Sequence, residues 1–223
     1  QNKPKGDTVK SCICTFCRMM VLAVCHRDIA MREKPNTTRL AILGGTFDPP
    51  HIGHLLMAQT ALETLAVDGV IFVPSGDPPH KDMHNIRPAE DRIGMIRAAT
   101  AWNPSFHVDD LEWHRKGKTY TIDTVSALRD KHPGAELFFL IGADSLNELH
   151  TWMRVEELLP LCRFVTFVRP GQAIETLQAN VTKLPQPWAT QLLQDMLQGR
   201  AINISSTECR QRVAQGLSIR YLV

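Results

Sequence analysis

A glycine-rich turn between an apolar run and a helical segment constrains the fold of this chain more than any other part of it. The run over 40–43 reads Leu-Ala-Ile-Leu, which is typical of a buried β-strand, and residues 55–63 are typical of a helix. Between them, residues 44–54 read Gly-Gly-Thr-Phe-Asp-Pro-Pro-His-Ile-Gly-His. A strand, a glycine turn and a helix direct backbone N–H groups and the positive end of a helix toward an anion. We therefore predict a phosphate-binding site at this turn.

The two histidines of the turn, His51 and His54, indicate chemistry as well as binding. An imidazole at a helix start can donate a hydrogen bond to negative charge that grows on a phosphate in a transition state. The alternative is that both histidines only cap or pack against the helix. The turn lacks the Gly-x-Gly-x-x-Gly pattern, which counts against a dinucleotide-binding dehydrogenase.

Strand and helix patterns alternate along the rest of the chain, as in an α/β protein with a parallel sheet. We expect strands at 40–43, 70–73, 106–108, 137–141, 164–168 and 201–204, and helices at 55–63, 88–102, 121–131, 155–159, 188–198 and 206–214. This order predicts a Rossmann-like, doubly wound sheet in a single domain with a C-terminal helical part. Polar and glycine-rich segments follow four of these strands, at 44–45, 74–81, 142–144 and 169–171, so we expect them to share one cleft.

A second polar segment, Ile-Ser-Ser-Thr-Glu-Cys-Arg at 204–210, stands far downstream of the first. Together the two segments resemble the paired signatures of the nucleotidyltransferase superfamily of adenylyl- and cytidylyltransferases, over residues 38–223. Within that superfamily the chain is most similar to bacterial nicotinate-nucleotide adenylyltransferases. That similarity rests on Pro-Ser-Gly-Asp-Pro-Pro-His-Lys at 74–81, Thr-Tyr-Thr at 119–121, Gly-Ala-Asp at 142–144, Trp152 and Arg-Pro-Gly at 169–171.

The resemblance implies direct adenylyl transfer in NAD biosynthesis: the phosphate of nicotinate mononucleotide attacks the α-phosphorus of ATP, and pyrophosphate leaves. It assigns catalysis to His51, His54 and Arg210. It assigns ATP binding to Gly44, Gly45, Thr46, Phe47, Asp144, Arg169, Ser205, Thr207 and Arg210. It assigns mononucleotide binding to His80, Lys81, Tyr120, Thr121 and Trp152. It also implies Mg²⁺ held mainly by the ATP phosphates, and we name no metal-binding residue.

Other interpretations remain at this point. The acceptor could instead be phosphopantetheine or nicotinamide mononucleotide, or the chain could be a nucleotide-binding module without catalysis. Several of the residues also have simpler roles. Ser205 is a good helix cap, Lys81 could be a solvated loop charge, and buried aromatics such as Tyr120 are more often core than ligand platforms.

Charge and cysteine usage limit the partners and the compartment. Residues 1–38 hold seven Lys/Arg and three Asp/Glu, whereas the remainder holds 18 and 20, which argues against nucleic acid as a partner. We expect residues 1–38 to be an atypical, disordered or loosely packed extension and residues 39–223 to be the nucleotidyltransferase domain. No segment predicts a membrane span, and Cys162 and Cys209 stand in contexts that suit reduced thiols, so we expect a cytoplasmic protein. The oligomeric state stays open, with a homo-oligomer as one option.

Overall fold

The computed structural model describes residues 37–77, 86–168, 177, 181, 183–200 and 202–223. Nearly all of the predicted extension, residues 1–36, lies outside this description, so the predicted domain boundary stays a prediction. Among the described residues, no helix is long and apolar enough to cross a membrane.

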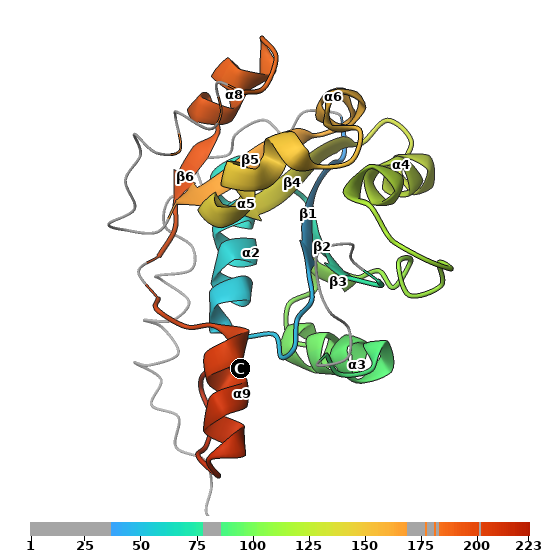
Figure 1. Cartoon of the computed structure of the whole chain (residues 1–223). Helices are drawn as coiled ribbons and strands as arrows, with labels where there is room; N and C mark the ends of the chain where they lie inside the picture. Colours follow the sequence, from blue (N-terminus) through green and yellow to red (C-terminus); the bar gives the residue numbers. More distant parts are fainter. Residues whose placement is uncertain (1–36, 78–85, 169–176, 178–180, 182, 201) are drawn as a thin grey trace, which may run out of the picture. The chain divides into compact units, whose positions relative to one another are not determined.

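A six-stranded parallel sheet forms the centre of the described fold, in the order β3-β2-β1-β4-β5-β6 (Figure 1). The strands are β1 (Arg39–Gly45), β2 (Gly69–Pro74), β3 (Phe106–Val108), β4 (Glu136–Gly142), β5 (Arg163–Val168) and β6 (Met196–Gln198). The chain first winds outward from β1 to β3 and then returns to add β4 on the other side of β1. The predicted doubly wound, Rossmann-like sheet is confirmed.

Alternate residues of the strands enter two separate cores, because successive side chains of a strand point to opposite faces of the sheet. Ile42, Ile71 and Phe139 lie in the first core, whereas Ala41, Phe72 and Phe138 lie in the second. Strands buried on both faces read as continuous apolar runs, which is why the central strands could be predicted from the sequence.

Helices cover both faces of the sheet. The longer ones are α2 (Ile52–Leu65), α3 (Ala89–Thr100), α4 (Thr121–Lys131), α8 (Trp188–Gln194) and α9 (Ser206–Ala214), and the short ones are α5 (Ala143–Glu148), η2 (Leu149–Thr151), α6 (Val155–Leu158) and η3 (Leu159–Leu161). Helix α2 buries Ala58 and Ala61 in the second core, and α4 buries its predicted apolar side chains in the first. The predicted C-terminal helix is α9.

The sequence interpretation was wrong at the last strand. The predicted helix over 188–198 ends at Gln194, and residues 196–198 form β6, whereas residues 202–204 lie outside any strand. The cause is tertiary: Met196, Leu197 and Gln198 pair with β5. Sheet pairing overrides the helical pattern in such a short segment. The short helix α5, directly after β4, was also not predicted.

Candidate active site

The carboxyl ends of β1 and β4 lie side by side where the strand order reverses. In open parallel α/β sheets, ligands bind in the crevice outside the carboxyl ends of the strands at such a point. The glycine turn follows β1, and Gly142 ends β4. The fold therefore brings the first predicted site segment and the Gly-Ala-Asp segment to one crevice.

The turn after β1 is held in a defined shape by Phe47. This residue has a φ of 52°, which is uncommon for a residue with a side chain, and it is only 2 % exposed. The ring packs against Phe72 and edge-on against His54, with centroid distances of 5.9 and 4.9 Å. A Cβ on Gly45 would meet that ring at 3.2 Å, so a glycine leaves the space that the ring fills.

His51 and His54 form a stacked pair at the start of α2. Their ring centroids are 3.8 Å apart with 26° between the planes. The backbone N–H of His51 donates to Nδ1 of the His54 ring at 3.2 Å. Because Nδ1 of His54 accepts this bond, the neutral ring carries its proton on Nε2. The ring of His54 therefore has its N–H donor at Nε2.

Helix α9 is fastened to the same turn by two hydrogen bonds. The Arg210 guanidinium donates from Nη1 to the Asp48 carbonyl at 2.6 Å, and the Ser206 hydroxyl donates to the Pro49 carbonyl at 2.8 Å. Arg210 also donates from Nη2 to the Thr207 hydroxyl at 3.2 Å. Figure 1 shows α9, in red, beside the start of α2. The second predicted signature thus lies directly against the first.

The helix itself starts as its sequence predicts. Ser205 is the N-cap of α9, and its hydroxyl accepts from the backbone N–H of Glu208 at 3.1 Å. The segment after α9 returns to the site, where the Leu222 carbonyl accepts from the N–H of Ile52 at 2.8 Å.

Within the described part of the chain, three cavities share His54 as a lining residue. The first, of about 200 Å³, is lined by His51, Met57, Asp144, Phe167, Ile202, Ile204, Ser205 and Ser206, among others. The second, of about 400 Å³, is lined by Gly44, Gly45, Thr46, Met57, Glu112, Tyr120, Thr121, Trp152 and Met153, among others. The third, also of about 400 Å³, is lined by Gly45, Thr46, Phe47, Asp48, Ser206, Thr207 and Arg210, among others.

After the parts of the substrates that the sequence analysis expects beside their lining residues, we call these the base cavity, the acceptor cavity and the phosphate cavity, in that order. The base cavity is mixed in character, with apolar side chains from α2 and β5 beside the Asp144 carboxylate. The phosphate cavity collects hydroxyls and the Arg210 guanidinium, which are groups suited to an anion. Their common boundary at His54 allows one extended ligand, or two ligands in contact, to meet there.

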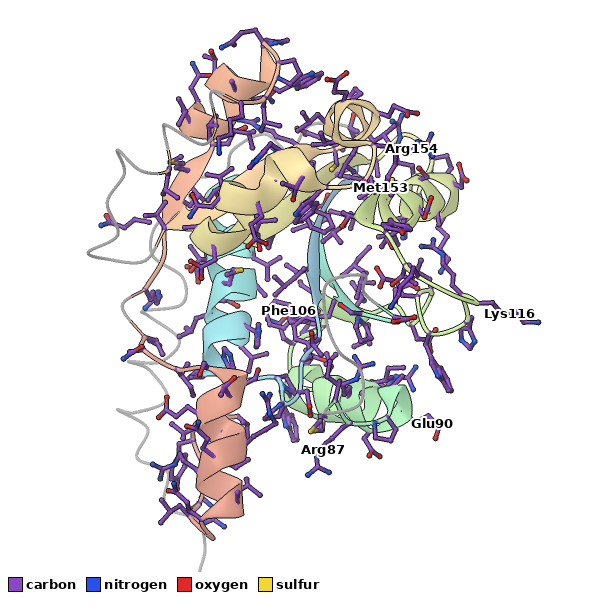
Figure 2. All side chains as sticks on the ribbon, viewed as in Figure 1. Arg87, Glu90, Phe106, Lys116, Met153 and Arg154 are labelled. Atoms are coloured by element: carbon purple, nitrogen blue, oxygen red, sulfur yellow. The ribbon has the colours of Figure 1, made fainter. Side chains whose placement is uncertain are left out.

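The acceptor cavity ends in an aromatic wall. The Trp152 ring lies edge-on to Phe139 and to Phe164, each at a centroid distance of 6.2 Å. Met153 beside it is 47 % exposed, and Figure 2 shows its position close to Arg154. The N-terminal end of α4 borders the same cavity through Thr121. The cavity therefore combines a flat apolar surface with the positive end of a helix.

Three of the predicted ligand-binding residues, His80, Lys81 and Arg169, lie outside the described residues. All the other predicted site residues line one or more of the three cavities. Among the described residues, no group of three or more His, Cys, Asp or Glu side chains is placed to hold a metal ion.

Some residues of the site were missed by the sequence analysis. Met57, one turn beyond His54 on α2, lines two of the cavities, and its spacing could have revealed it. Ser206 lies inside the second signature and lines two cavities as well. Arg92 and Glu112 gave no signal, since a charged residue in a helix or loop is ordinarily solvated.

Comparison with known proteins shows the family of this chain. Residues 42–212 match the model of the cytidylyltransferase-like family, and the chain therefore belongs to that family. Relatives from Halalkalibacterium halodurans and Shouchella clausii are 42 and 44 % identical over 83 % of this chain and 84 and 89 % of their own. Both are named probable nicotinate-nucleotide adenylyltransferase, as is a relative from Trichlorobacter lovleyi at 42 % identity. Within the family, the chain groups with the nicotinate-nucleotide adenylyltransferases.

Solved structures share the fold. The nicotinic acid mononucleotide adenylyltransferase of Plasmodium falciparum, complexed with NaAD, superimposes with a TM-score of 0.65 at 19 % identity, over 82 % of this chain and 87 % of that one. A nicotinate-nucleotide adenylyltransferase homologue from Vibrio parahaemolyticus superimposes with a TM-score of 0.57 at 17 % identity, over 84 and 94 % of the two chains. At these identities the likeness shows the fold alone.

Proposed function

We propose that this enzyme transfers the adenylyl group of ATP to nicotinate mononucleotide, forming the deamido dinucleotide and pyrophosphate in NAD biosynthesis. The observation that carries the proposal is the meeting of the three cavities at His54. The base cavity suits a nucleoside, the phosphate cavity suits a chain of phosphates, and the acceptor cavity suits a flat acidic ring. The names of the relatives at 42–44 % identity support the same reaction.

The chemistry needs no protein nucleophile. A phosphate monoester already carries negative charge at neutral pH, so its oxygen attacks the α-phosphorus in line while the bond to pyrophosphate breaks. Catalysis then consists of positioning the two reactants and stabilising charge on the α-phosphate. We assign that stabilisation to His51 and His54, and the Nε2–H of His54 is the donor that this geometry favours.

The ATP half of the site would use the N-terminal ends of two helices, α2 and α9. Ser205, Thr207 and Arg210 at the start of α9 would bind the β- and γ-phosphates, with Arg210 also holding the turn at Asp48. The backbone of Gly44, Gly45, Thr46 and Phe47 would approach the nucleotide, and Asp144 in the base cavity would accept from ribose hydroxyls. Arg169 would serve the same end of the nucleotide.

The acceptor half would hold the pyridine ring against Trp152, with Tyr120 and Thr121 beside it. A nicotinate ring carries a carboxylate that a nicotinamide ring lacks. The N-terminal end of α4 borders this cavity, and its positive dipole end favours a carboxylate over a neutral amide. His80 and Lys81 would bind the phosphate of the mononucleotide.

Magnesium would enter with the ATP. Mg²⁺ prefers phosphate oxygens and water to a cage of protein ligands, so it would be held mainly by the ATP phosphates, where it would supply positive charge. The Thr207 hydroxyl and the Arg210 guanidinium, which line the phosphate cavity, would bind phosphate oxygens of the leaving pyrophosphate.

We place the reaction in the cytoplasm, with small nucleotides rather than nucleic acid as ligands. Cys162 and Cys209 are buried free thiols, and burial raises the pKa of Cys162 to about 12. Thiols kept in this state suit a reducing compartment. Residues 39–223 carry two more acidic than basic side chains, so they have no excess of positive charge that would favour binding of a polyanion.

The test is pyrophosphate release from ATP and Mg²⁺ with three acceptors in parallel: nicotinate mononucleotide, nicotinamide mononucleotide and phosphopantetheine. We expect turnover with the acid mononucleotide and a kcat/KM lower by about tenfold or more with the amide, which is the effect of about 1.4 kcal/mol of carboxylate recognition. Turnover with phosphopantetheine alone would support adenylyl transfer but contradict nicotinate mononucleotide as the acceptor. Binding of ATP without turnover on any acceptor would favour a non-catalytic module.

A further inference from the structure

We propose that Arg92 and Glu112 are a pair of positioning residues that fix the phosphate-binding turn relative to the acceptor cavity. Neither residue belongs to a sequence signature recognised above. The inference rests on the proposed function in one respect, since it takes the two sides of the cleft to hold two different substrates.

Arg92 lies on α3 and is completely buried, at 0 % exposure. Its guanidinium donates to three backbone carbonyls: from Nη1 to Thr46 at 2.8 Å, from Nη2 to Ser75 at 2.9 Å and from Nε to Arg87 at 3.0 Å. A buried charge is costly unless its hydrogen bonds are made, so a helix with an arginine on its buried face needs this arrangement. A lysine carries its donors on one nitrogen and cannot reproduce such a planar fork.

The three carbonyls belong to three different segments. Thr46 lies in the phosphate-binding turn after β1, Ser75 follows β2, and Arg87 precedes α3. The Ser75 N–H also donates to the Gly45 carbonyl at 2.8 Å, so the two strand ends are tied directly as well. Arg92 therefore fixes which way the peptide of Thr46 faces and how far the turn stands from β2.

Glu112 binds the segment that follows β2. Its carboxylate accepts from the Gly76 N–H at 3.1 Å and from the Thr124 hydroxyl, in the first turn of α4, at 2.6 Å. A Cβ on Gly76 would stand 2.4 Å from the Glu112 carbonyl, so the two backbones are in close contact and Gly76 must be a glycine. Glu112 thus ties the end of β2 to the helix start that borders the acceptor cavity.

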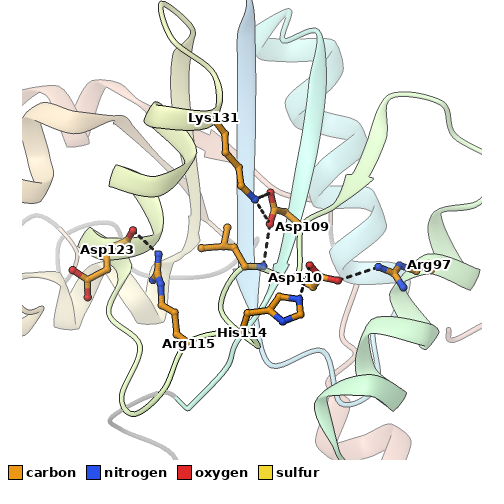
Figure 3. A network of polar contacts seen from close by, with 8 residues as sticks. Arg97, Asp109, Asp110, His114, Arg115, Asp123 and Lys131 are labelled. Carbon is orange, nitrogen blue, oxygen red and sulfur yellow. Dashed lines mark hydrogen bonds and ion pairs between the residues drawn. The ribbon is translucent and has the colours of Figure 1, made fainter.

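The loop that carries Glu112 is fastened on both sides, as Figure 3 shows. Asp110 pairs with Arg97 of α3 at 3.1 Å, and Asp109 pairs with Lys131 of α4 at 2.8 Å. Arg115 donates to the Asp123 carbonyl at 2.7 Å. These contacts keep the backbone of the loop in place, so that the Glu112 carboxylate can act as a fixed anchor.

One continuous path of polar contacts therefore joins the two halves of the cleft. It runs from Thr46 through Arg92 to residues 75–76, and on through Glu112 to Thr124. Burial lowers the pKa of Arg92, and the negative charges of Asp48 and Glu112 oppose that effect. The charges of Arg92 and Glu112, both within the path, thus stabilise each other across the end of β2.

A role in positioning predicts a kinetic signature. A displacement of about 1 Å between reacting groups costs about 10²-fold in rate. We expect Arg92→Lys to lower kcat by about 10²-fold and to raise the KM for ATP more than that for the acceptor. We expect Glu112→Gln to raise the KM for the acceptor by about tenfold, as charged hydrogen bonds become neutral ones, with a smaller effect on ATP.

Two matched substitutions far from the cleft serve as controls. Arg163 pairs with the buried Asp195 at the amino end of β5, and Glu136 pairs with Arg39 at the amino end of β4. Arg163→Lys and Glu136→Gln should lower Tm while leaving kcat and both KM values within about twofold of the wild type. If Arg92→Lys and Glu112→Gln behave in the same way, with only Tm reduced, their role is structural and the proposal is overturned.

Binding of an unreactive ATP analogue with a methylene bridge, measured by calorimetry, separates this proposal from the proposed function. If the wild type binds the analogue but turns over no acceptor, the function fails. Arg92→Lys should even then weaken analogue binding by about tenfold, and Arg163→Lys should not. Should Arg92→Lys fail to fold, Glu112→Gln provides the test. We expect this variant to have a higher KM for the acceptor and weaker protection of the α4 amides from hydrogen exchange. If either quantity is unchanged, the proposal that Arg92 and Glu112 are positioning residues is contradicted.

Discussion

At the scale of single residues, Gly53 decides whether the histidine pair can form. A Cβ at this position would lie 3.0 Å from two atoms of the His51 ring, closer than such contacts normally come. Glycine is otherwise a poor choice inside a helix, by about 1 kcal/mol relative to alanine. The first turn of α2 thus contains a residue that weakens the helix and leaves room for a stacked ring.

We therefore predict that Gly53→Ala separates stability from activity. The helix gains up to about 1 kcal/mol of propensity, so Tm should stay level or rise, whereas kcat should fall about tenfold or more as the His51 ring is displaced. Thermal unfolding and steady-state kinetics on one preparation check both. Gly94→Ala on α3 is the control, because its Cβ would meet nothing within 4 Å, and it should leave kcat unchanged.

The sequence reveals some single residues of the site and hides others for a physical reason. His51 and His54 stand in a strand, turn and helix segment that indicates phosphate chemistry, and Arg210 stands in the second segment, whose family resemblance implies its role. Arg92 occupies a helix position next to Ile93 and Ile96, which the apolar period places on the buried face, but nothing local says that a charge will be buried there. Its three acceptors come from 5, 17 and 46 residues away, so only the folded chain brings them together.

At the scale of elements, the docking of α9 is what completes the phosphate cavity. The helix is short and polar, and only Cys209 of its residues is buried. Its place is set by the contacts of Ser206 and Arg210 with the carbonyls of the turn at 48–49. Such a helix depends on a few specific hydrogen bonds rather than on a large apolar face.

Ser206→Ala should loosen this helix. The substitution removes the hydrogen bond to Pro49, so we expect a loss of about 1 kcal/mol in the free energy of unfolding and a KM for ATP raised about fivefold, with the acceptor KM nearly unchanged. Thr190→Ala on α8 removes an exposed contact with Gln186 and provides the comparison. Equal kinetic constants in the two variants would show that α9 is held by something else.

The elements also show where sequence patterns stop being informative. β1, β2 and β4 are long apolar runs buried on both faces, and their pattern alone identifies them. β6 has three residues and continues the amphipathic pattern of α8, so its pairing with β5 cannot be predicted locally. The buried Asp195, paired with Arg163, marks the change from helix to strand.

At the scale of the whole described fold, the sheet order brings the site residues that follow β1 and β4 to the carboxyl ends of neighbouring strands. Strand ends that are nearly 100 residues apart in sequence lie next to each other, as Leu43 and Leu140 show. The doubly wound order could be anticipated from the alternation of strands and helices, together with the expectation of a shared cleft. The division of that cleft into three cavities could not, because it depends on Met57, His54 and Ser206, each of which lines more than one cavity in the folded chain.

We propose that His54, where the three cavities meet, stabilises the transition state of adenylyl transfer. The most direct measurement compares kcat and ATP affinity for the wild type, His54→Ala and His107→Ala, the last an exposed histidine on β3. We predict that His54→Ala lowers kcat by about 10²–10³-fold while ATP affinity changes far less, and that His107→Ala matches the wild type. A His54→Ala enzyme with kcat near the wild-type value would contradict this role of His54.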